Sequence, residues 1–145
     1  MLNQSDLAGR RFPLFVDLTN RKCLVVGGGT MAVEKARLLL DFGAFVTILS
    51  HKGEREVGAL EKNYASCSIE NRKFNAGDLN GVTLVISATG DIEVDSIIAN
   101  AATTLSIPVN VVDNKTLSTF SVPAIVDRGS IQLGISSGGK SPSLV

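Results

Sequence analysis

Short apolar runs alternate with longer amphipathic segments over the first 113 residues of the chain. Runs rich in β-branched residues predict strands, and segments with apolar side chains at helical spacing predict helices. The predicted strands span residues 22–26, 44–49, 68–74, 84–88 and 108–112, and the predicted helices span residues 31–42, 53–64 and 92–105. Helices between consecutive strands imply crossover connections and a parallel sheet that is buried on both faces. We therefore expect an α/β fold with a Rossmann-like, doubly wound parallel sheet.

The pattern changes after Asp113. Two strand-like runs, residues 120–126 and 130–135, follow one another closely, and Asp127-Arg-Gly between them is a typical turn sequence. These residues predict a β-hairpin rather than another strand–helix unit. Because an isolated hairpin is only marginally stable, we expect residues 114–145 to pack on the first domain or on a second chain.

Composition and charge exclude several classes of partner. The 145 residues include 14 Lys and Arg against 14 Asp and Glu, so the formal charge is zero and no nucleic-acid partner is expected. The polar N-terminus lacks the apolar run of a secretion signal, and no apolar stretch approaches the roughly 20 residues that span a bilayer. One His and two Cys cannot form a four-ligand zinc site, so no metal site is predicted. We expect a cytoplasmic protein without a membrane partner, in which Cys23 and Cys67 are reduced core thiols.

A glycine-rich loop, residues 27–32, follows the first predicted strand and opens the first predicted helix. It fits the pattern G-x-G-x-x-G/A, in which the first glycine allows a tight turn and the second lets backbone amides approach a pyrophosphate. Ala32 is small enough for the helix to pack closely on the strand, and the pyrophosphate then lies at the positive end of that helix. We predict a dinucleotide site that includes Gly27, Gly28 and Gly29. The alternative is a glycine loop that merely turns the chain.

The residues after the second predicted strand leave the choice of cofactor open. Many NAD sites have an acidic residue here that binds the ribose hydroxyls, but this strand ends Leu49-Ser-His-Lys. Ser50 or a backbone amide could bind the ribose of NAD instead, whereas Lys52 could face the 2′-phosphate of NADP. Lys52 is equally consistent with an exposed loop lysine that contacts no cofactor.

A second glycine-rich sequence, residues 134–141, matches the phosphate-loop pattern G-x-x-x-x-G-K-[ST]. That loop requires a following helix and a later strand with an Asp for magnesium, but here Pro142 follows at once. We therefore do not expect nucleotide hydrolysis. Exposed amides, hydroxyls and an ammonium group suit anions such as ligand carboxylates, so this segment is predicted to bind substrate. The predicted contacts are Ser136, Ser137, Gly138 and Lys140.

Carboxylates near the ends of the predicted strands are the candidate catalytic groups, because doubly wound folds bind ligands beyond the carboxyl ends of their strands. Asp113 ends the fifth strand, Asp91 lies just past the fourth, and Asp78 lies in a loop. We expect Asp113 to point into the crevice near the nicotinamide. The alternative for Asp113 is a helix-capping or turn aspartate. We expect His51 beside the adenosine end rather than as a general base.

Several blocks of sequence occur in a characteristic order from about residue 11 to the end of the chain. They are Phe12-Pro-Leu-Phe-Val-Asp-Leu18, Val25-Val-Gly-Gly-Gly29, Glu34-Lys-Ala-Arg-Leu-Leu-Leu40, Asn110-Val-Val-Asp113, Pro123-Ala-Ile-Val-Asp-Arg128 and Ser136-Ser-Gly-Gly-Lys-Ser-Pro142. Together they resemble the precorrin-2 dehydrogenase / siroheme synthase N-terminal family. Because several blocks match in order, this resemblance is more specific than the glycine loop alone.

The resemblance implies NAD-dependent oxidation of precorrin-2 to sirohydrochlorin by a homodimer. It implies that residues 1–113 are the NAD-binding domain and that residues 114–145 are a dimerisation and tetrapyrrole-binding segment. The catalytic aspartate of the family falls on Asp113, and a serine that is phosphorylated in some relatives falls on Ser137. The family's cofactor contacts fall on Thr30, Met31, His51, Lys52, Ala88 and Thr89.

Family members continue into a C-terminal helical region that helps to cover the tetrapyrrole, and we expect that region to be absent from a chain ending at Val145. Two other functions stay open. One is a bifunctional enzyme that is also a sirohydrochlorin ferrochelatase, in which metal insertion would depend on Asp113 and the nitrogens of the macrocycle. The other is a non-catalytic NAD-sensing module, which would bind the dinucleotide but no tetrapyrrole.

Overall fold

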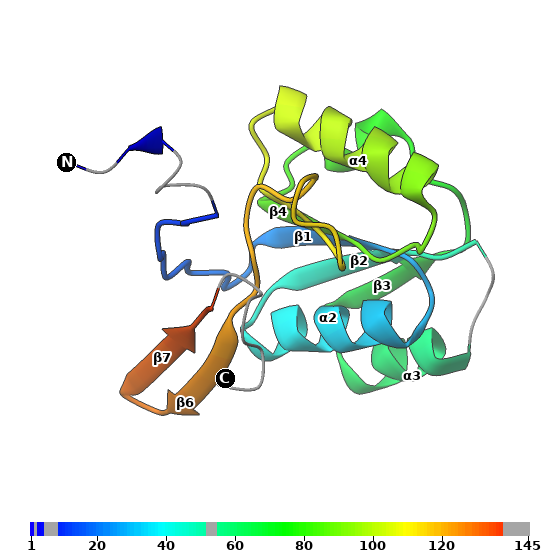
Figure 1. Ribbon diagram of the computed structural model, residues 1–145. Coiled ribbons are helices and arrows are strands. Elements are labelled where there is room, and N and C mark those ends of the chain that lie inside the picture. Colours follow the sequence, from blue (N-terminus) through cyan, green and yellow to red (C-terminus); the bar gives the residue numbers. More distant parts are fainter. Residues whose placement is uncertain (2, 5–8, 52–54, 138–145) are drawn as a thin grey trace. The chain divides into compact units, whose positions relative to one another are not determined.

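A computed structural model describes residues 1, 3–4, 9–51 and 55–137 of the chain. The chain divides into two compact units (Figure 1). Residues 17–121 form the larger unit, and residues 1–16 form the smaller one together with the segment that starts at Val122. No helix in the described ranges is both long and apolar enough to cross a membrane.

The larger unit is built on a five-stranded parallel sheet with the strand order β3-β2-β1-β4-β5. The strands are β1 (Lys22–Val26), β2 (Phe45–Leu49), β3 (Cys67–Glu70), β4 (Leu84–Ser87) and β5 (Val109–Val111). The helices are α2 (Thr30–Asp41), α3 (Arg55–Asn63), the 3₁₀ helix η1 (Ala76–Leu79) and α4 (Ile92–Thr104). The strand order reverses between β1 and β4, the point at which doubly wound sheets bind their ligands. The predicted Rossmann-like fold is confirmed.

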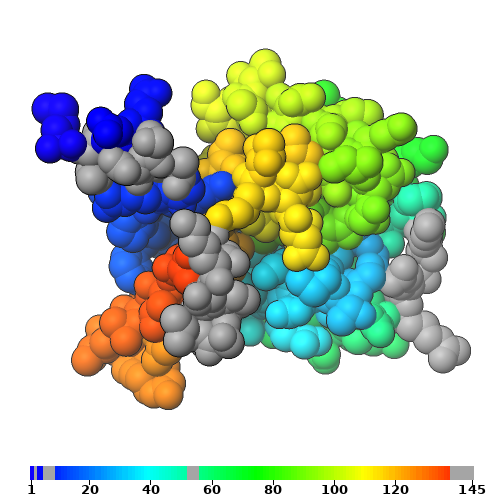
Figure 2. Space-filling model, viewed as in Figure 1, coloured from blue at the N-terminus to red at the C-terminus, as the bar shows by residue number. Residues whose placement is uncertain are grey.

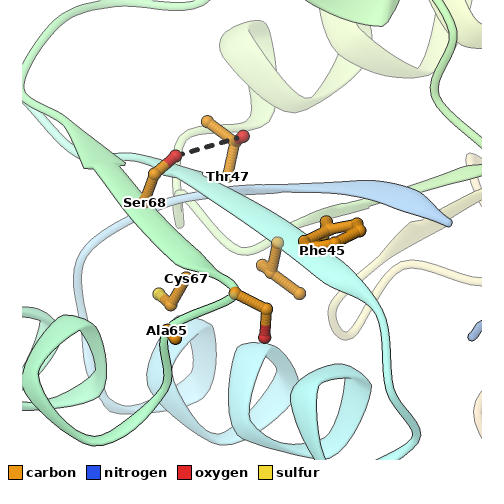
Figure 3. A pocket seen from close by; sticks show the side chains of 7 residues that line it. Phe45, Thr47, Ala65, Cys67 and Ser68 are labelled. Atoms are coloured by element: carbon orange, nitrogen blue, oxygen red, sulfur yellow. Dashed lines mark hydrogen bonds between the residues drawn. The ribbon is translucent and has the colours of Figure 1, made fainter. Parts of the chain in front are cut away.

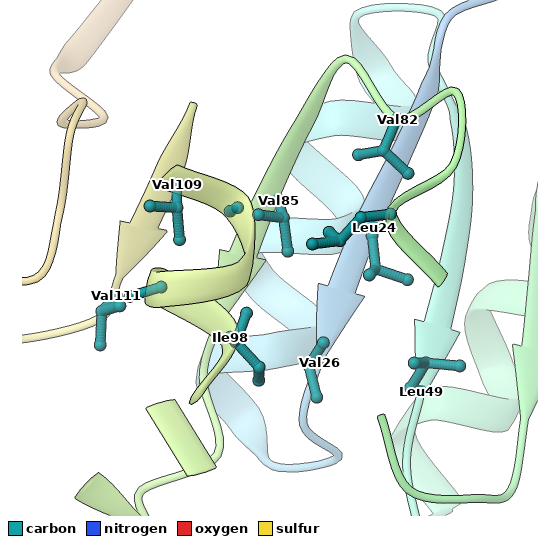
Figure 4. Packing of buried hydrophobic residues seen from close by; sticks show 11 residues of the cluster. Leu24, Val26, Leu49, Val82, Val85, Ile98, Val109 and Val111 are labelled. Carbon is teal, nitrogen blue, oxygen red and sulfur yellow. The ribbon is translucent and has the colours of Figure 1, made fainter. Parts of the chain in front are cut away.

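Helices cover both faces of the sheet, with α2 and α3 on one face and α4 on the other (Figure 1). Because β1 and β4 lie inside the sheet, the side chains of Cys23–Val26 and Leu84–Ser87 are all buried. Near-continuous apolar runs are typical of strands that are covered on both faces. On the α4 side, Ile98 packs in one cluster with Leu24 and Val85 (Figure 4). This packing fixes the ends of β1 and β4, where the loops of the candidate site begin.

The helices and strands of the larger unit lie within a residue or two of their predicted limits, except at the end of β3. This strand ends at Glu70, whereas the sequence predicts that it extends to Phe74. In the turn that follows, the guanidinium group of Arg72 pairs with Glu70 (2.6 Å) and with Asp78 (2.5 Å). The hydrogen bonds from Arg72 hold the pKa of Asp78 below its usual value. Asp78 is therefore a structural carboxylate of this turn.

The smaller unit contains the predicted hairpin. Strands β6 (Ala124–Arg128) and β7 (Ile131–Ile135) are antiparallel, and Arg128 lies opposite Ile131. Gly129 has a φ of 72°, which a glycine adopts without strain. The carboxylate of Asp127 accepts a hydrogen bond from the N–H of Gly129 (3.1 Å). These two residues explain the position of the turn.

The sequence predicts that the first hairpin strand starts at Phe120, and this limit is wrong. The segment before Val122 bonds to β5 of the larger unit instead. The N–H of Thr119 donates to the carbonyl of Val109 (2.8 Å), and the hydroxyl of Thr119 accepts from the N–H of Val109 (2.9 Å). The side-chain amide of Asn110 donates to the carbonyl of Phe120 (3.1 Å). Periodicity alone does not reveal which strand an apolar run will join.

Candidate functional site

The turn between β1 and α2 consists of three consecutive glycines, and its first position requires a glycine. Gly27 has a φ of 132°, which side chains rarely adopt, and a Cβ there would collide with the carbonyl oxygen of Ala88. The N–H of Gly27 donates to the carbonyl of Leu49 at the end of β2 (2.9 Å). The loop therefore packs against the ends of both strands that flank β1.

Gly29 is the N-cap residue of α2, and the space beside it is open. Its φ of −83° suits any residue, and a Cβ would meet no described atom within 4 Å. The helix has no side-chain cap and no acidic residue in its first turn. The backbone N–H groups at the start of a helix lack partners within it and carry a partial positive charge. This end of α2 is therefore suited to the pyrophosphate that the sequence predicts.

The two predicted contacts after the glycines lie at the start of α2. Thr30 is exposed, and its hydroxyl donates to the carboxylate of Glu56 in α3 (3.5 Å). The side chain of Met31 is exposed as well. Both side chains are accessible at the edge where the cofactor is predicted, so the structure is consistent with these two predicted contacts.

The loop after β2 begins without a carboxylate for the ribose. Ser50 is buried, and its hydroxyl has no hydrogen-bond partner among the described residues. His51 is exposed, and Lys52 lies outside the described residues. The side-chain amide of Asn71, with its nitrogen turned toward this loop, donates to the carbonyl groups of Ser50 (2.8 Å) and His51 (3.3 Å). Sequence reasoning missed Asn71, because an Asn directly after a strand is also typical of an ordinary turn.

The loop after β4 is held by a buried carboxylate that sequence reasoning missed. Asp95 in α4 accepts hydrogen bonds from the hydroxyls of Ser87 and Thr89, both at 2.6 Å. Since the hydroxyl of Thr89 is engaged with Asp95, a cofactor contact from Thr89 would use its backbone. The sequence does contain a signal for this network. Ser87 and Asp95 are polar residues at positions that the hydrophobic pattern assigns to a buried strand and to the buried face of a helix.

Asp91, the second candidate carboxylate, is the N-cap residue of α4. Its side chain accepts hydrogen bonds from the N–H groups of Glu93 (3.0 Å) and Val94 (3.4 Å). An aspartate in this position stabilises the start of a helix. The carboxylate of Asp91 therefore serves as a helix cap.

Asp113 lies in a tight turn that follows β5. Its φ of 61° is left-handed, a conformation that Asp and Asn tolerate better than most residues. The N–H of Val112 donates to the carbonyl of Ser87 (2.9 Å), so the turn starts beside the end of β4. The hydroxyl of Ser118 closes the turn by donating to the carbonyl of Asn114 (2.7 Å). These bonds place Asp113 at the same edge of the sheet as the glycine loop.

The backbone of Asp113 belongs to the turn, but its carboxylate does not stabilise it. No hydrogen bond or ion pair of this carboxylate occurs within the part of the chain that the structure describes. The neighbouring Asn114 supplies a side-chain bond to the turn instead, because its Oδ1 accepts from the N–H of Leu117 (3.1 Å). The carboxylate of Asp113 is therefore available to a ligand.

Two of the predicted substrate contacts, Ser136 and Ser137, directly follow β7 in the smaller unit. Ser136 is exposed and Ser137 is half-buried. Gly138 and Lys140 lie outside the described residues. The role of all four in substrate binding stays a prediction.

A surface pocket of about 190 Å³ lies beside the start of β2 and β3 (Figure 3). It is lined by the first residues of β2 and β3, including Phe45 and Cys67, whereas the glycine loop lies where the strands end. The hydroxyls of Thr47 and Ser68 bond across it (3.5 Å). Ligand pockets usually enclose roughly 300–1,000 Å³, so this hollow does not compete with the carboxyl edge as the candidate site.

Both cysteines are buried and free. Burial raises the pKa of the Cys23 thiol and that of the Cys67 thiol to about 11. Because the thiolate is the reactive form, both are inert thiols at neutral pH. Among the described residues, no three or more His, Cys, Asp or Glu side chains gather where they could hold a metal ion.

The glycine turn, the uncapped start of α2 and the loop after β4 meet beside the point where the strand order reverses. This arrangement defines a dinucleotide-binding domain of the Rossmann type. Residues 14–124 match the model of a family described as "Putative NAD(P)-binding", and the chain belongs to that family. The predicted cofactor is confirmed as far as NAD(P).

Siroheme synthases and a precorrin-2 dehydrogenase are similar to the chain over most of its length. It is 43% identical over 133 residues to the siroheme synthase of Nitrosomonas eutropha and 45% identical over 133 residues to that of Tolumonas auensis. Each match covers 92% of this chain and 28% of the relative. A solved structure titled "SirC, precorrin-2 dehydrogenase" matches with a TM-score of 0.72 and 28% identity, over 92% of this chain and 65% of SirC. The family resemblance that the sequence blocks indicate is confirmed, and the chain spans only part of each of these relatives.

Proposed function

We propose that the chain is the dehydrogenase part of a sirohaem-forming enzyme, which oxidises precorrin-2 to sirohydrochlorin with NAD. The observation that supports this best is the carboxylate of Asp113, which has no hydrogen bond or ion pair among the described residues and lies at the same sheet edge as the glycine loop. The similarity to siroheme synthases and to SirC, titled a precorrin-2 dehydrogenase, makes precorrin-2 the first substrate to test.

The proposed reaction removes two hydrogens from the macrocycle, one as a hydride and one as a proton. NAD, when bound, accepts the hydride and becomes NADH. Asp113 receives the proton from the macrocycle, and solvent removes it after turnover. The loop amides and the start of α2 hold the pyrophosphate, which leaves the nicotinamide end of the cofactor near the ends of β4 and β5.

Mixing the purified chain with NAD and precorrin-2 tests this proposal. The expected result is one NADH formed for each sirohydrochlorin. The visible absorbance of the macrocycle measures the sirohydrochlorin. NAD binding without any product would support an NAD-sensing module instead. If ferrous iron and sirohydrochlorin form sirohaem faster with the chain than without it, the proposal extends to the bifunctional enzyme.

We expect NAD to bind several-fold more tightly than NADP. The family resemblance supports this preference. Calorimetric titration with each cofactor measures the preference. If Lys52 faced a 2′-phosphate, Lys52→Ala would weaken NADP more than NAD, and a several-fold preference of the parent protein for NADP would contradict the proposal.

We propose that the hairpin unit forms a homodimer. Its N-terminal segment and its strands expose many large apolar side chains, and the hairpin is the orange segment in Figure 2. They include Phe12, Leu14, Phe15, Ile131, Leu133 and Ile135. Apolar surface of this kind is typical of a protein–protein interface.

Light scattering of two matched variants tests the dimer. Ile131 in β7 and Ile97 in α4 are equally exposed, at 62% each. Ile131→Glu is expected to produce a monomer at micromolar concentration, because it places a charge in the proposed interface. Ile97→Glu is expected to stay dimeric like the parent. A monomeric parent protein would contradict the proposal.

We also propose a cytoplasmic location. The two free, buried thiols and the absence of a disulfide between them suit a reducing compartment.

A further inference from the structure

Asp95 is a buried carboxylate that the proposed reaction does not use. It lies in the first turn of α4 and is 6% exposed. A carboxylate is rarely buried to this degree unless its neighbours satisfy it with hydrogen bonds. The groups that satisfy Asp95 therefore indicate what it does.

Two hydroxyl groups donate to the same oxygen of Asp95. The hydroxyl of Ser87, the last residue of β4, lies 2.6 Å from Oδ1, and that of Thr89 also lies at 2.6 Å. The hydroxyl of Thr89 in turn accepts from the N–H of Asp91 (3.1 Å), the N-cap residue of α4. Asp95 thus links the end of β4, the loop after it and the start of α4.

This network flanks Ala88, whose carbonyl group lies against Gly27 of the glycine loop. Ala88 lies between Ser87 and Thr89, and its N–H donates to the carbonyl of Val26 at the end of β1 (2.8 Å). Its own carbonyl oxygen occupies the space that a Cβ on Gly27 would need. The position of Ala88 therefore determines how close the glycine loop can approach β4.

The same network reaches the turn that carries Asp113. The carbonyl of Ser87 accepts from the N–H of Val112 (2.9 Å), while the side chain of Ser87 is bonded to Asp95. Ser87 is fully buried, so water cannot replace either partner. Asp95 therefore supports both the loop that would hold the cofactor and the turn that would hold the catalytic carboxylate.

We propose that Asp95 is a positioning residue for the dinucleotide site. It holds Ser87 and Thr89 so that Ala88 presses against Gly27 and keeps the pyrophosphate loop in its binding conformation. The expected effect of Asp95 on cofactor affinity requires only that the chain binds NAD(P). It does not require precorrin-2 to be the substrate. A failure of the proposed reaction would therefore leave this inference untouched.

Calorimetric titration of NAD into three variants tests the proposal. Asp95→Ala removes the acceptor of the buried Ser87 hydroxyl and of the partly buried Thr89 hydroxyl. It is expected to raise the Kd for NAD by about 10-fold or more, the equivalent of one hydrogen bond to a charged group. Asp95→Asn keeps an oxygen acceptor at the same place, so its Kd is expected within about three-fold of the parent. Leu39→Ala removes a buried side chain from α2 and serves as the stability control. It is expected to lower the melting temperature while the Kd for NAD stays at the parental value.

Ser87→Ala covers the case in which Asp95→Ala does not fold. It removes one donor of the network at a fully buried position that cannot touch the cofactor. We expect it to raise the Kd for NAD several-fold. The Kd of the double variant Ser87→Ala/Asp95→Asn is expected to stay within about three-fold of that of Ser87→Ala alone. A parental Kd in Asp95→Ala, or in Ser87→Ala where the first does not fold, overturns the proposal. An Asp95→Asn variant as weak as Asp95→Ala overturns it as well.

Discussion

Replacing Asp113 with Asn is expected to reduce the turnover of precorrin-2 by roughly 10²- to 10⁴-fold, the usual contribution of a positioned acid or base. Asn has the same size and adopts the left-handed backbone conformation that Asp113 has at a φ of 61°, so the turn should fold unchanged. The amide cannot accept the proton. Single-turnover oxidation of precorrin-2 with saturating NAD measures the effect directly.

Two further measurements separate chemistry from binding and folding. The affinity of Asp113→Asn for NAD should stay within a few-fold of the parent, since the pyrophosphate contacts lie on a different loop. Asp91→Asn is the matched control, because the side chain of Asp91 caps α4 and Asn caps a helix as well as Asp does. We expect that control to turn over at nearly the parental rate. A near-parental rate in Asp113→Asn would show that Asp113 is only a turn residue.

Gly29→Asp is expected to abolish tight NAD binding while leaving the fold intact. The φ of Gly29 is −83° and no described atom lies within 4 Å of a Cβ there, so the new side chain meets no obstacle. Its carboxylate would occupy the place of the pyrophosphate, and like charges about 4 Å apart repel by on the order of 4 kcal/mol at an intermediate dielectric. That energy corresponds to a loss of about 10³-fold in affinity by calorimetry.

The stability of the same variant gives an independent readout. Asp is a stronger N-cap residue than Gly, so the free protein is expected to melt at the parental temperature or slightly above it. Gly29→Ala adds a Cβ without a charge and should weaken NAD binding less. Gly27→Ala should instead lower the melting temperature, because its Cβ would collide with the carbonyl of Ala88. Parental NAD affinity in a folded Gly29→Asp protein would refute the site.

The elements that the sequence predicted are those whose signals lie close together in the chain. Each strand of the parallel sheet is a short apolar run, and each helix has its own periodic pattern, so the alternation predicted the fold class. The glycine loop and the turn at Asp127–Gly129 were predicted for the same reason, because Gly27 and Gly129 adopt backbone conformations that favour glycine. The charged turn at Arg72 was not predicted, since Asp78 lies six residues away and an apolar pattern does not register ion pairs.

The sequence by itself thus determined the parallel sheet, the place of the dinucleotide loop and the candidate carboxylate at the end of β5. Only the tertiary structure decided which polar groups are partners. It joined Asp95 to Ser87 and bonded Thr119 back to Val109. The physical reason is that hydropathy specifies which positions are buried, whereas a buried polar group finds its partner only where packing brings separate segments of the chain together.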